Sequence, residues 1–295
     1  MTTTDPAAQP RCILTVHAHP DDESSKGPGT IARYAAEGVR TVLVTCTGGE
    51  AGDILNPAAD SEEARTNLAA VRRRELEEAV GIIGYHRLVW LGYRDSGMPG
   101  TPTNEHPGCF HRADLDEAVV RLVRVAREER PQVMVAYGPS DAGRGHPDHI
   151  RTHEIGLAAF ERAGDPAWYP EAGAPWQPSK LYYVGVFSRP RLQAMHEWLT
   201  AQELESPWGE RLVAMADLPD RTTTRIDITD HLDVGRRALL AHRTQIDPSG
   251  HWFRVPLEVL AELHPYEDYE LAASRVSTAW PEGGFEDDLF AGIGR

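Results

Sequence analysis

Short apolar runs alternate with amphipathic, helix-like runs through the first two thirds of the chain. The apolar runs have the length and β-branched content of strands, and they lie at residues 12–17, 41–46, 87–91, 132–137 and 181–187. Apolar residues at helical spacing predict helices at residues 29–37, 61–83, 114–129 and 147–162. Gly38 is typical of a helix end and Ser61 of a helix cap. Strands that alternate with helices predict an α/β fold, a mostly parallel sheet with helices on both faces.

The pattern becomes less regular in the last third of the chain. We expect helices at 190–199, 231–245 and 258–263, and strands at 222–228 and 269–276. The whole pattern predicts an α/β domain over residues 1–189, with sheet order 3-2-1-4-5, and a C-terminal α+β elaboration over residues 190–295 packed on the same domain. The aromatic-rich segments 168–176 and 252–253 either line a pocket or pack in the ordinary way.

Composition narrows the classes of partner. The net charge of −15 argues against nucleic acid or an anionic membrane as the main partner, because both require a basic surface. Cys12, Cys46 and Cys109 show no CxxC spacing, which predicts reduced thiols in a cytoplasmic protein. We expect no signal peptide in residues 1–9 and no membrane-spanning segment. The sequence leaves open whether the chain is a homo-oligomer.

Two histidine–aspartate clusters carry the candidate chemistry. Residues 19–23 read His-Pro-Asp-Asp-Glu and residues 146–149 read His-Pro-Asp-His, each between a predicted strand and a predicted helix. In an open parallel sheet, ligands bind outside the carboxyl ends of the strands, where the strand order reverses. For the order 3-2-1-4-5, this point lies between strands 1 and 4, which the two clusters follow. We therefore expect the clusters to meet in space.

His19, Asp22 and His149 are the predicted ligands of one Zn²⁺ ion. Two imidazoles and one carboxylate leave room for water and a substrate oxygen, and such a site lowers the pKa of bound water toward about 7. Asp21 is the predicted general base. His146 would stabilise an oxyanion or protonate a leaving amine, and Asp148 would orient His146 through a hydrogen bond.

Other interpretations of these clusters exist. Either cluster alone is typical of a surface turn, and it is their presence at equivalent strand–helix junctions that favours a metal site. A dinucleotide enzyme would carry GxGxxG after the first strand, and none is present there.

Four segments together resemble the LmbE-like zinc hydrolases, a family of N-acetylglucosaminyl deacetylases. They are His-Ala-His-Pro-Asp-Asp-Glu-Ser-Ser-Lys-Gly at 17–27, Thr-Gly-Gly-Glu-Ala-Gly-Asp-Ile-Leu-Asn-Pro at 47–57, Trp-Leu-Gly-Tyr-Arg-Asp-Ser-Gly at 90–97 and Asp-Asp-Leu-Phe-Ala-Gly-Ile at 287–293. The resemblance implies a Rossmann-like domain, one zinc per chain, and the same roles for the cluster residues. Within the family, these segments are similar to the amidases that act on mycothiol S-conjugates.

This resemblance implies a substrate and a set of contacts. The reaction would cleave the amide between the N-acetylcysteinyl group and glucosamine in S-substituted mycothiol, giving a mercapturic acid and glucosaminyl-inositol, either in detoxification or in the processing of a mycothiol adduct during natural-product biosynthesis. Lys26 marks the amidase branch and would contact the conjugate. Arg72 and Asp95 would hold sugar–inositol hydroxyls, with Glu50 on the same rim. From the residues alone, Lys26 is also compatible with a solvated lysine and Arg72 with a charged helix face.

Arg144 departs from the family pattern, which usually has tyrosine two residues before the second cluster. A permanently charged guanidinium could take the role of the tyrosine hydroxyl at the oxyanion, bind an anionic group of the substrate, or swing outward. The alternative activity is deacetylation of N-acetylglucosaminyl-inositol. A second alternative is a binding protein without turnover, against which the intact acid–base set argues.

Overall fold

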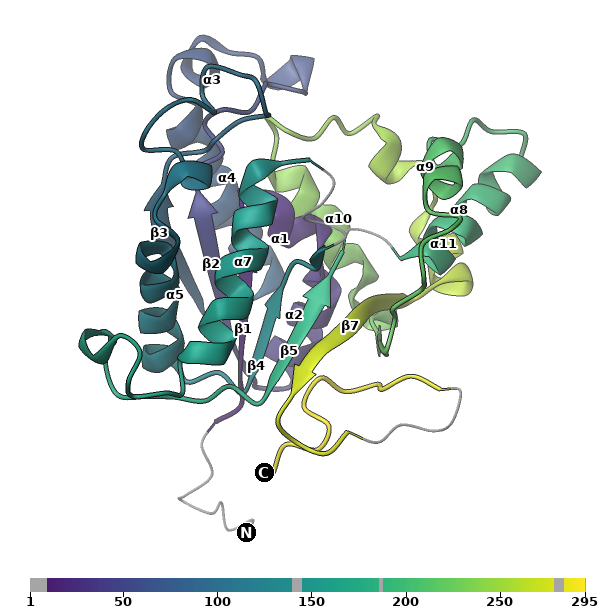
Figure 1. Ribbon diagram of the computed structural model, residues 1–295. Coiled ribbons are helices and arrows are strands. Elements are labelled where there is room, and N and C mark those ends of the chain that lie inside the picture. Colours follow the sequence, from purple (N-terminus) through teal and green to yellow (C-terminus); the bar gives the residue numbers. More distant parts are fainter. Residues whose placement is uncertain (1–9, 140–144, 186–187, 279–283, 295) are drawn as a thin grey trace.

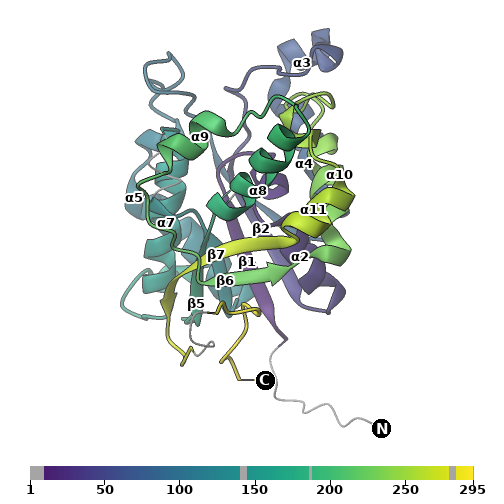
Figure 2. The same cartoon turned by 90° about the vertical axis from the view of Figure 1, so that its right-hand side faces the viewer.

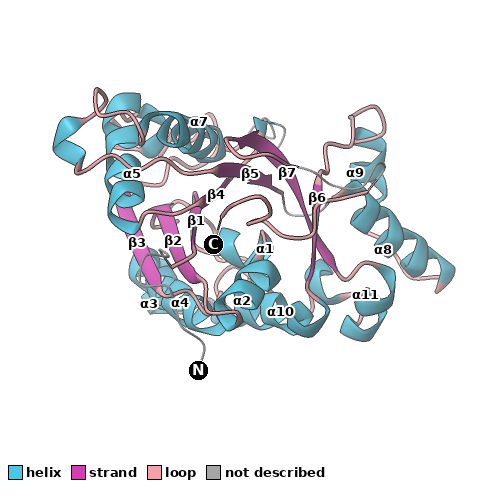
Figure 3. Ribbon diagram, turned by 90° about the horizontal axis from the view of Figure 1, so that it is seen from below, coloured by secondary structure: helices cyan, strands magenta, loops and turns pink. Residues whose placement is uncertain are grey.

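A twisted central sheet with helices on both faces forms the fold in the computed structural model, which describes residues 10–139, 145–185, 188–278 and 284–294 (Figures 1 and 3). The strand order is β3-β2-β1-β4-β5-β7-β6. The parallel strands are β1 (Cys12–His17), β2 (Arg40–Thr47), β3 (Arg87–Tyr93), β4 (Val133–Ala136) and β5 (Lys180–Val184). The predicted fold class and the predicted order 3-2-1-4-5 are confirmed.

Strand β1 lies at the centre of the parallel part and positions the first cluster. All of its residues are buried, which explains why its sequence is a continuous apolar run rather than an alternating one. It pairs with β2 on one side, from Cys12 with Arg40 to His17 with Thr45, and with β4 on the other. The strand order therefore reverses next to β1 and β4, so the loops that follow these two strands leave the sheet side by side.

Two apolar cores lie on opposite faces of the sheet (Figure 3). Helices α5 (Leu115–Glu129) and α7 (Pro147–Arg162) cover one face, where Leu122 and Phe160 are fully buried. Helices α2 (Pro28–Ala36), α4 (Leu68–Ile83) and α10 (Leu232–Ala241) cover the other face. The apolar face of each helix packs on the sheet, as the periodic pattern predicts.

The single helix predicted over residues 61–83 is wrong. The chain forms α3 (Glu62–Thr66) and α4, which meet at Asn67, where φ is −145° and ψ is 51°. Ser61 caps α3 as expected, since its hydroxyl accepts a hydrogen bond from the amide of Ala64. The other helices are α1 (Asp22–Ser25), α8 (Arg189–Ala201), α9 (Gly209–Ala214) and α11 (Leu257–Leu263), and short 3₁₀ turns lie at Pro57–Ala59, Phe110–Arg112, Pro170–Ala172, Thr229–His231 and His251–Phe253. Neither α1 nor α9 was predicted.

The last third of the chain extends the same sheet (Figure 2). Strand β7 (Tyr266–Ser274) pairs antiparallel with β5 and with β6 (Thr224–Asp227). Helix α10 packs against α1, α2 and α4, and so reaches the elements that carry the first cluster. The boundary at residue 189 stays a prediction. All three cysteines are free and buried, and among the described residues no helix is both long and apolar enough for a membrane span.

Candidate metal centre and its surroundings

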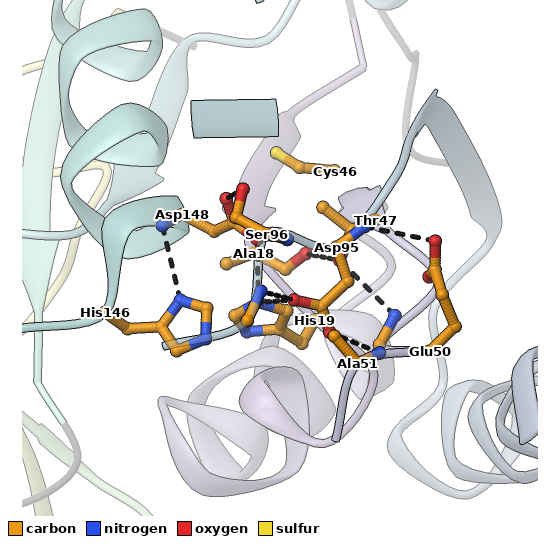
Figure 4. Close-up of polar contacts among 12 residues, drawn as sticks. Ala18, His19, Cys46, Thr47, Glu50, Ala51, Asp95, Ser96, His146 and Asp148 are labelled. Atoms are coloured by element: carbon orange, nitrogen blue, oxygen red, sulfur yellow. Dashed lines mark hydrogen bonds and ion pairs between the residues drawn. The ribbon is translucent and has the colours of Figure 1, made fainter. Parts of the chain in front are cut away.

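The loops after β1 and β4 bring the two clusters together (Figure 4). Pro147 occupies the first turn of α7, where its missing N–H is harmless, and His146 caps this helix. The ring centroids of His19 and His146 are 4.4 Å apart, and those of His19 and His149 are 5.4 Å apart. The predicted meeting of the clusters is therefore what the structure shows.

Two imidazole nitrogens converge on one carboxylate oxygen, and the three atoms together are potential metal ligands. Asp22 Oδ2 lies 3.4 Å from His19 Nδ1 and 3.6 Å from His149 Nε2. The ligand atoms of these three residues all lie within 4.8 Å of one another. His19 and Asp22 are buried, whereas the His149 side chain is 20% exposed. Two imidazoles and one carboxylate, with one side open to solvent, suit a catalytic zinc.

A second group with metal-binding chemistry shares His19. It comprises His19, Asp95 and His146, whose ligand atoms are also within 4.8 Å of one another. His19 Nε2 lies 3.7 Å from Asp95 Oδ1. Asp95 accepts hydrogen bonds on both oxygens, from the amides of Gly97 and Ala51, and Asp22 likewise accepts on both, from the His19 amide and from Lys26. The convergence on Asp22 Oδ2 makes the first group the better ligand set.

The electrostatic environment of the cluster favours a positive charge. Burial alone would lower the pKa of His19, but hydrogen bonds with Asp148 and Asp22 raise it to about 10. Burial raises the pKa of Asp22, yet Lys26 and His149 hold it well below its usual value. Burial and the neighbouring His19 lower the pKa of His146 to about 4. The field that keeps a proton on buried His19 would also attract a cation.

Asp148 does not orient His146 as predicted. Its carboxylate is fully buried and lies 3.3 Å from His19 Nε2. It also accepts hydrogen bonds from the amide of Ser96 at 2.9 Å and from the Ser96 hydroxyl. Only the Asp148 amide faces His146, donating to its Nδ1. The first turn of α7 points the Asp148 side chain into the protein, so the carboxylate orients His19, which is the usual outer-shell arrangement of a metal-binding histidine.

Asp21 is held beside the ligand set in an unusual backbone conformation. Its φ is 101°, a value that typically costs about 1–3 kcal/mol in a residue other than glycine. Arg72 Nη2 lies 2.9 Å from Asp21 Oδ2, and the Asp21 side chain remains 29% exposed. Burial raises the pKa of Asp21, and the Arg72 charge opposes this only in part. A carboxylate with a raised pKa is a stronger base.

Arg72 is buried and donates hydrogen bonds to neighbouring backbone carbonyls, so it is not part of a solvated, charged helix face. It is 3% exposed and donates to the carbonyls of Gly49 at 2.6 Å and Pro20 at 2.5 Å, in addition to its contact with Asp21. Gly49 has φ +68°, and a Cβ there would lie 2.5 Å from Arg72 Cζ. The guanidinium therefore makes hydrogen bonds to other parts of the protein, and its contact with sugar hydroxyls stays a prediction.

Lys26 is buried and not solvated. Its ammonium pairs with Asp22 Oδ1 and lies 5.2 Å from the centre of the Tyr137 ring. Lys26 thus contacts a predicted metal ligand directly, which the sequence interpretation did not foresee. The contact of Lys26 with a substrate stays a prediction.

Glu50 and Asp95 lie next to each other on the loops after β2 and β3 (Figure 4). Glu50 Oε1 accepts a hydrogen bond from the Asp95 amide at 3.1 Å. Both therefore stabilise the loops around His19, and their substrate contacts stay predictions. Arg144 lies outside the described residues.

Sequence reasoning missed three residues at this site. The Tyr137 hydroxyl accepts from the Ala18 amide at 3.0 Å, and its ring centre lies 4.8 Å from that of His149. Glu23 pairs with His242, which lies at the end of α10. An apolar run already contained Tyr137, and no local pattern links Glu23 to a residue in the last third of the chain.

A pocket with aromatic, polar and charged lining residues adjoins helix α1. Trp208, Trp252 and Phe253 line it, together with Ser24 and Ser25 of α1. None of the three ligand candidates is among its lining residues. Of the two aromatic-rich segments in the sequence, 252–253 lines this pocket. In the other segment, the Trp176 indole donates to the Pro131 carbonyl, which is ordinary packing.

These features define an α/β protein with a two-histidine, one-carboxylate cluster suited to a metal ion. The family model "PIG-L: GlcNAc-PI de-N-acetylase" matches residues 14–160. The chain is 48% identical to the mycothiol S-conjugate amidase of Streptomyces coelicolor, over 95% of this chain and 97% of the relative. It is 40% identical to the 1D-myo-inositol 2-acetamido-2-deoxy-alpha-D-glucopyranoside deacetylase of Thermobifida fusca, over 95% and 99%.

A solved structure has the same fold. The N,N′-diacetylchitobiose deacetylase of Pyrococcus horikoshii superposes with a TM-score of 0.62 at 21% identity, over 88% of this chain and 83% of that one. The chain belongs to the PIG-L, or LmbE-like, family, and it is a hydrolase of amide bonds. The predicted family is confirmed.

Proposed function

We propose that this protein is a zinc-dependent amidase of S-substituted mycothiol. It would release an N-acetylcysteine S-conjugate and glucosaminyl-inositol, as a step of detoxification. The observation that carries the proposal is the 48% identity to a mycothiol S-conjugate amidase over nearly the full length of both chains. The cluster after β1 and β4, which contains a group that could hold a metal ion, supports the proposal and would supply the acid–base groups that amide hydrolysis requires.

His19, Asp22 and His149 would hold the zinc ion. When bound, zinc lowers the pKa of water and polarises a carbonyl oxygen. Asp148 fixes the orientation of the His19 ring, because its carboxylate accepts a hydrogen bond from Nε2. The other ring nitrogen, Nδ1, then faces Asp22. Lys26 fixes Asp22 in the same way, through the other carboxylate oxygen.

Asp21 and His146 would move the protons and stabilise charge. Asp21 accepts a proton from the attacking water and delivers it to the nitrogen of the leaving glucosamine. His146 Nδ1 accepts the Asp148 amide hydrogen bond, so the ring proton of the neutral tautomer lies on Nε2. This Nε2–H would donate to the oxyanion that develops on the amide carbonyl.

A comparison of two substrates tests this function. We expect kcat/KM for a mycothiol S-conjugate to exceed that for N-acetylglucosaminyl-inositol at least tenfold, a preference of about 1.4 kcal/mol. The reverse preference would assign the deacetylase activity, which the 40% identity to a deacetylase makes the second candidate.

The Asp21→Ala variant tests the chemistry. We expect it to keep its zinc and to lose turnover by about 10² to 10⁴. Asp233→Ala is the matched control, since Asp233 is an exposed carboxylate of α10 that pairs with Arg237 at the surface. Loss of zinc in Asp21→Ala would show that the ligand assignment is wrong.

A further inference from the structure

We propose that Glu23 and His242 are positioning residues that hold Asp21 in its active conformation. The inference rests on the proposed role of Asp21 as the general base. It assigns a task to two buried residues that are not themselves ligand candidates, and it links the last third of the chain to the reaction.

The peptide group between Pro20 and Asp21 is clamped on both sides. Its carbonyl oxygen accepts from Arg72 Nη2 at 2.5 Å, and its N–H donates to Glu23 Oε2 at 2.9 Å. Rotation of this peptide group changes φ of Asp21, which is 101°. A conformation this unfavourable persists only where the surroundings enforce it. Arg72 and Glu23 together provide that enforcement.

Glu23 is itself held from the C-terminal part of the chain. Its second oxygen, Oε1, lies 2.7 Å from His242 Nε2 and also accepts from the Ser24 hydroxyl at 2.5 Å. The Glu23 side chain is 1% exposed and that of His242 is fully buried. His242 directly follows α10, which packs against α1 and α4, the helices that carry Glu23 and Arg72. The clamp therefore exists only when α10 is in place.

Removal of the His242 donor should release the clamp. A buried carboxylate that loses its main partner is strongly destabilised, so Glu23 would turn away to find another donor or solvent. The Asp21 N–H would then lose its acceptor and φ could relax to a negative value. The Asp21 carboxylate would leave its place beside Asp22, and a displacement of about 1 Å at a catalytic group can cost roughly a hundredfold in rate.

The experiment compares two substitutions of His242 in the full-length protein. His242→Phe keeps a ring but removes the donor, whereas His242→Gln keeps an N–H that can reach Glu23. We expect kcat of His242→Phe to fall about tenfold to a hundredfold, with KM and zinc content unchanged, and His242→Gln to recover most of the loss. Crystal structures of both variants should show φ of Asp21 relaxed in His242→Phe and retained in His242→Gln.

A second buried pair provides the control. His264 Nε2 lies 2.9 Å from Asp268 Oδ2, and this pair is buried like the first but does not contact the Asp21 turn. His264→Phe should leave kcat unchanged. Equal losses in His242→Phe and His264→Phe would reveal a general effect on folding and overturn the proposal.

The structural measurement separates this inference from the proposed function. If φ of Asp21 and its contact with Arg72 are unchanged in His242→Phe, the positioning role is wrong, whatever the activity. If His242→Phe does not fold, Glu23→Ala provides the same structural test, because it removes the acceptor of the Asp21 amide directly. If the unmodified protein has no amidase activity, the proposed function fails, and the structures alone still decide the positioning role.

Discussion

Replacement of Asp148 by asparagine tests what the negative charge of this carboxylate contributes to the support of His19. The Asp148 carboxylate accepts from His19 Nε2, from the Ser96 amide and from the Ser96 hydroxyl, and it is fully buried. An asparagine can keep all three contacts. Its carbonyl oxygen takes the place of Oδ2, and its NH₂ donates to the Ser96 hydroxyl, which also accepts from the His111 amide. Asp148→Asn should therefore fold normally and lose only the charge.

The loss of this charge should weaken zinc binding. A hydrogen bond to a charged group contributes about 1.5–3 kcal/mol and a neutral one about 0.5–1.5 kcal/mol, so His19 loses roughly 1–2 kcal/mol of support. This corresponds to an increase of roughly 5- to 30-fold in the dissociation constant, consistent with the 10- to 100-fold range for partners of metal-binding histidines.

Competition with a chromophoric chelator at neutral pH measures the change in zinc affinity. Asp268→Asn is the matched control, because Asp268 is a buried carboxylate paired with a histidine outside the metal centre. It should bind zinc as the unmodified protein does. A folded Asp148→Asn variant with unchanged zinc affinity would refute the idea that Asp148 supports the metal through His19.

Three further predictions follow from named contacts. Asp22→Asn should lose zinc while Asp95→Asn retains it, as measured by metal analysis after dialysis; the opposite result would place the ion at the His19, Asp95 and His146 group. Gly49→Ala should destabilise the protein by about 1–3 kcal/mol in urea unfolding, because of its positive φ and its approach to Arg72. Gly38→Ala has a similar φ but open space around its Cβ, so an equal effect of both would exclude the Arg72 contact as a cause. Burial raises the pKa of Asp268, but hydrogen bonds from His264 and Ser188 outweigh this and hold the pKa below its usual value. Because the folded pKa is lowered, Asp268 stabilises the fold above about pH 4, and this contribution is lost as pH falls through the folded pKa. The unfolding free energy of Asp268→Asn should therefore change less between pH 5 and 3 than that of the unmodified protein, and identical acid profiles would contradict this.

The order of the parallel strands could be predicted because their signals are local. Burial on both faces makes β1 a continuous apolar run, and the periodic helices between strands require parallel crossovers. The helix at 61–83 was too long because a one-residue interruption at Asn67 leaves the apolar periodicity on both sides almost intact. Antiparallel addition of β7 to β5 has no local signature, since it depends on which edge of the sheet remains open.

At the site, the sequence by itself determined which residue types gather after β1 and β4, because parallel strands place their carboxyl ends at one edge. Only the tertiary structure decided how those residues pair. Asp148 faces His19 rather than His146, Lys26 and Arg72 are buried on Asp22 and Asp21, and Glu23 meets a histidine more than 200 positions away. Periodicity records whether a side chain faces the core, but a hydrogen bond between distant side chains depends on atomic positions that are fixed only when the helices pack.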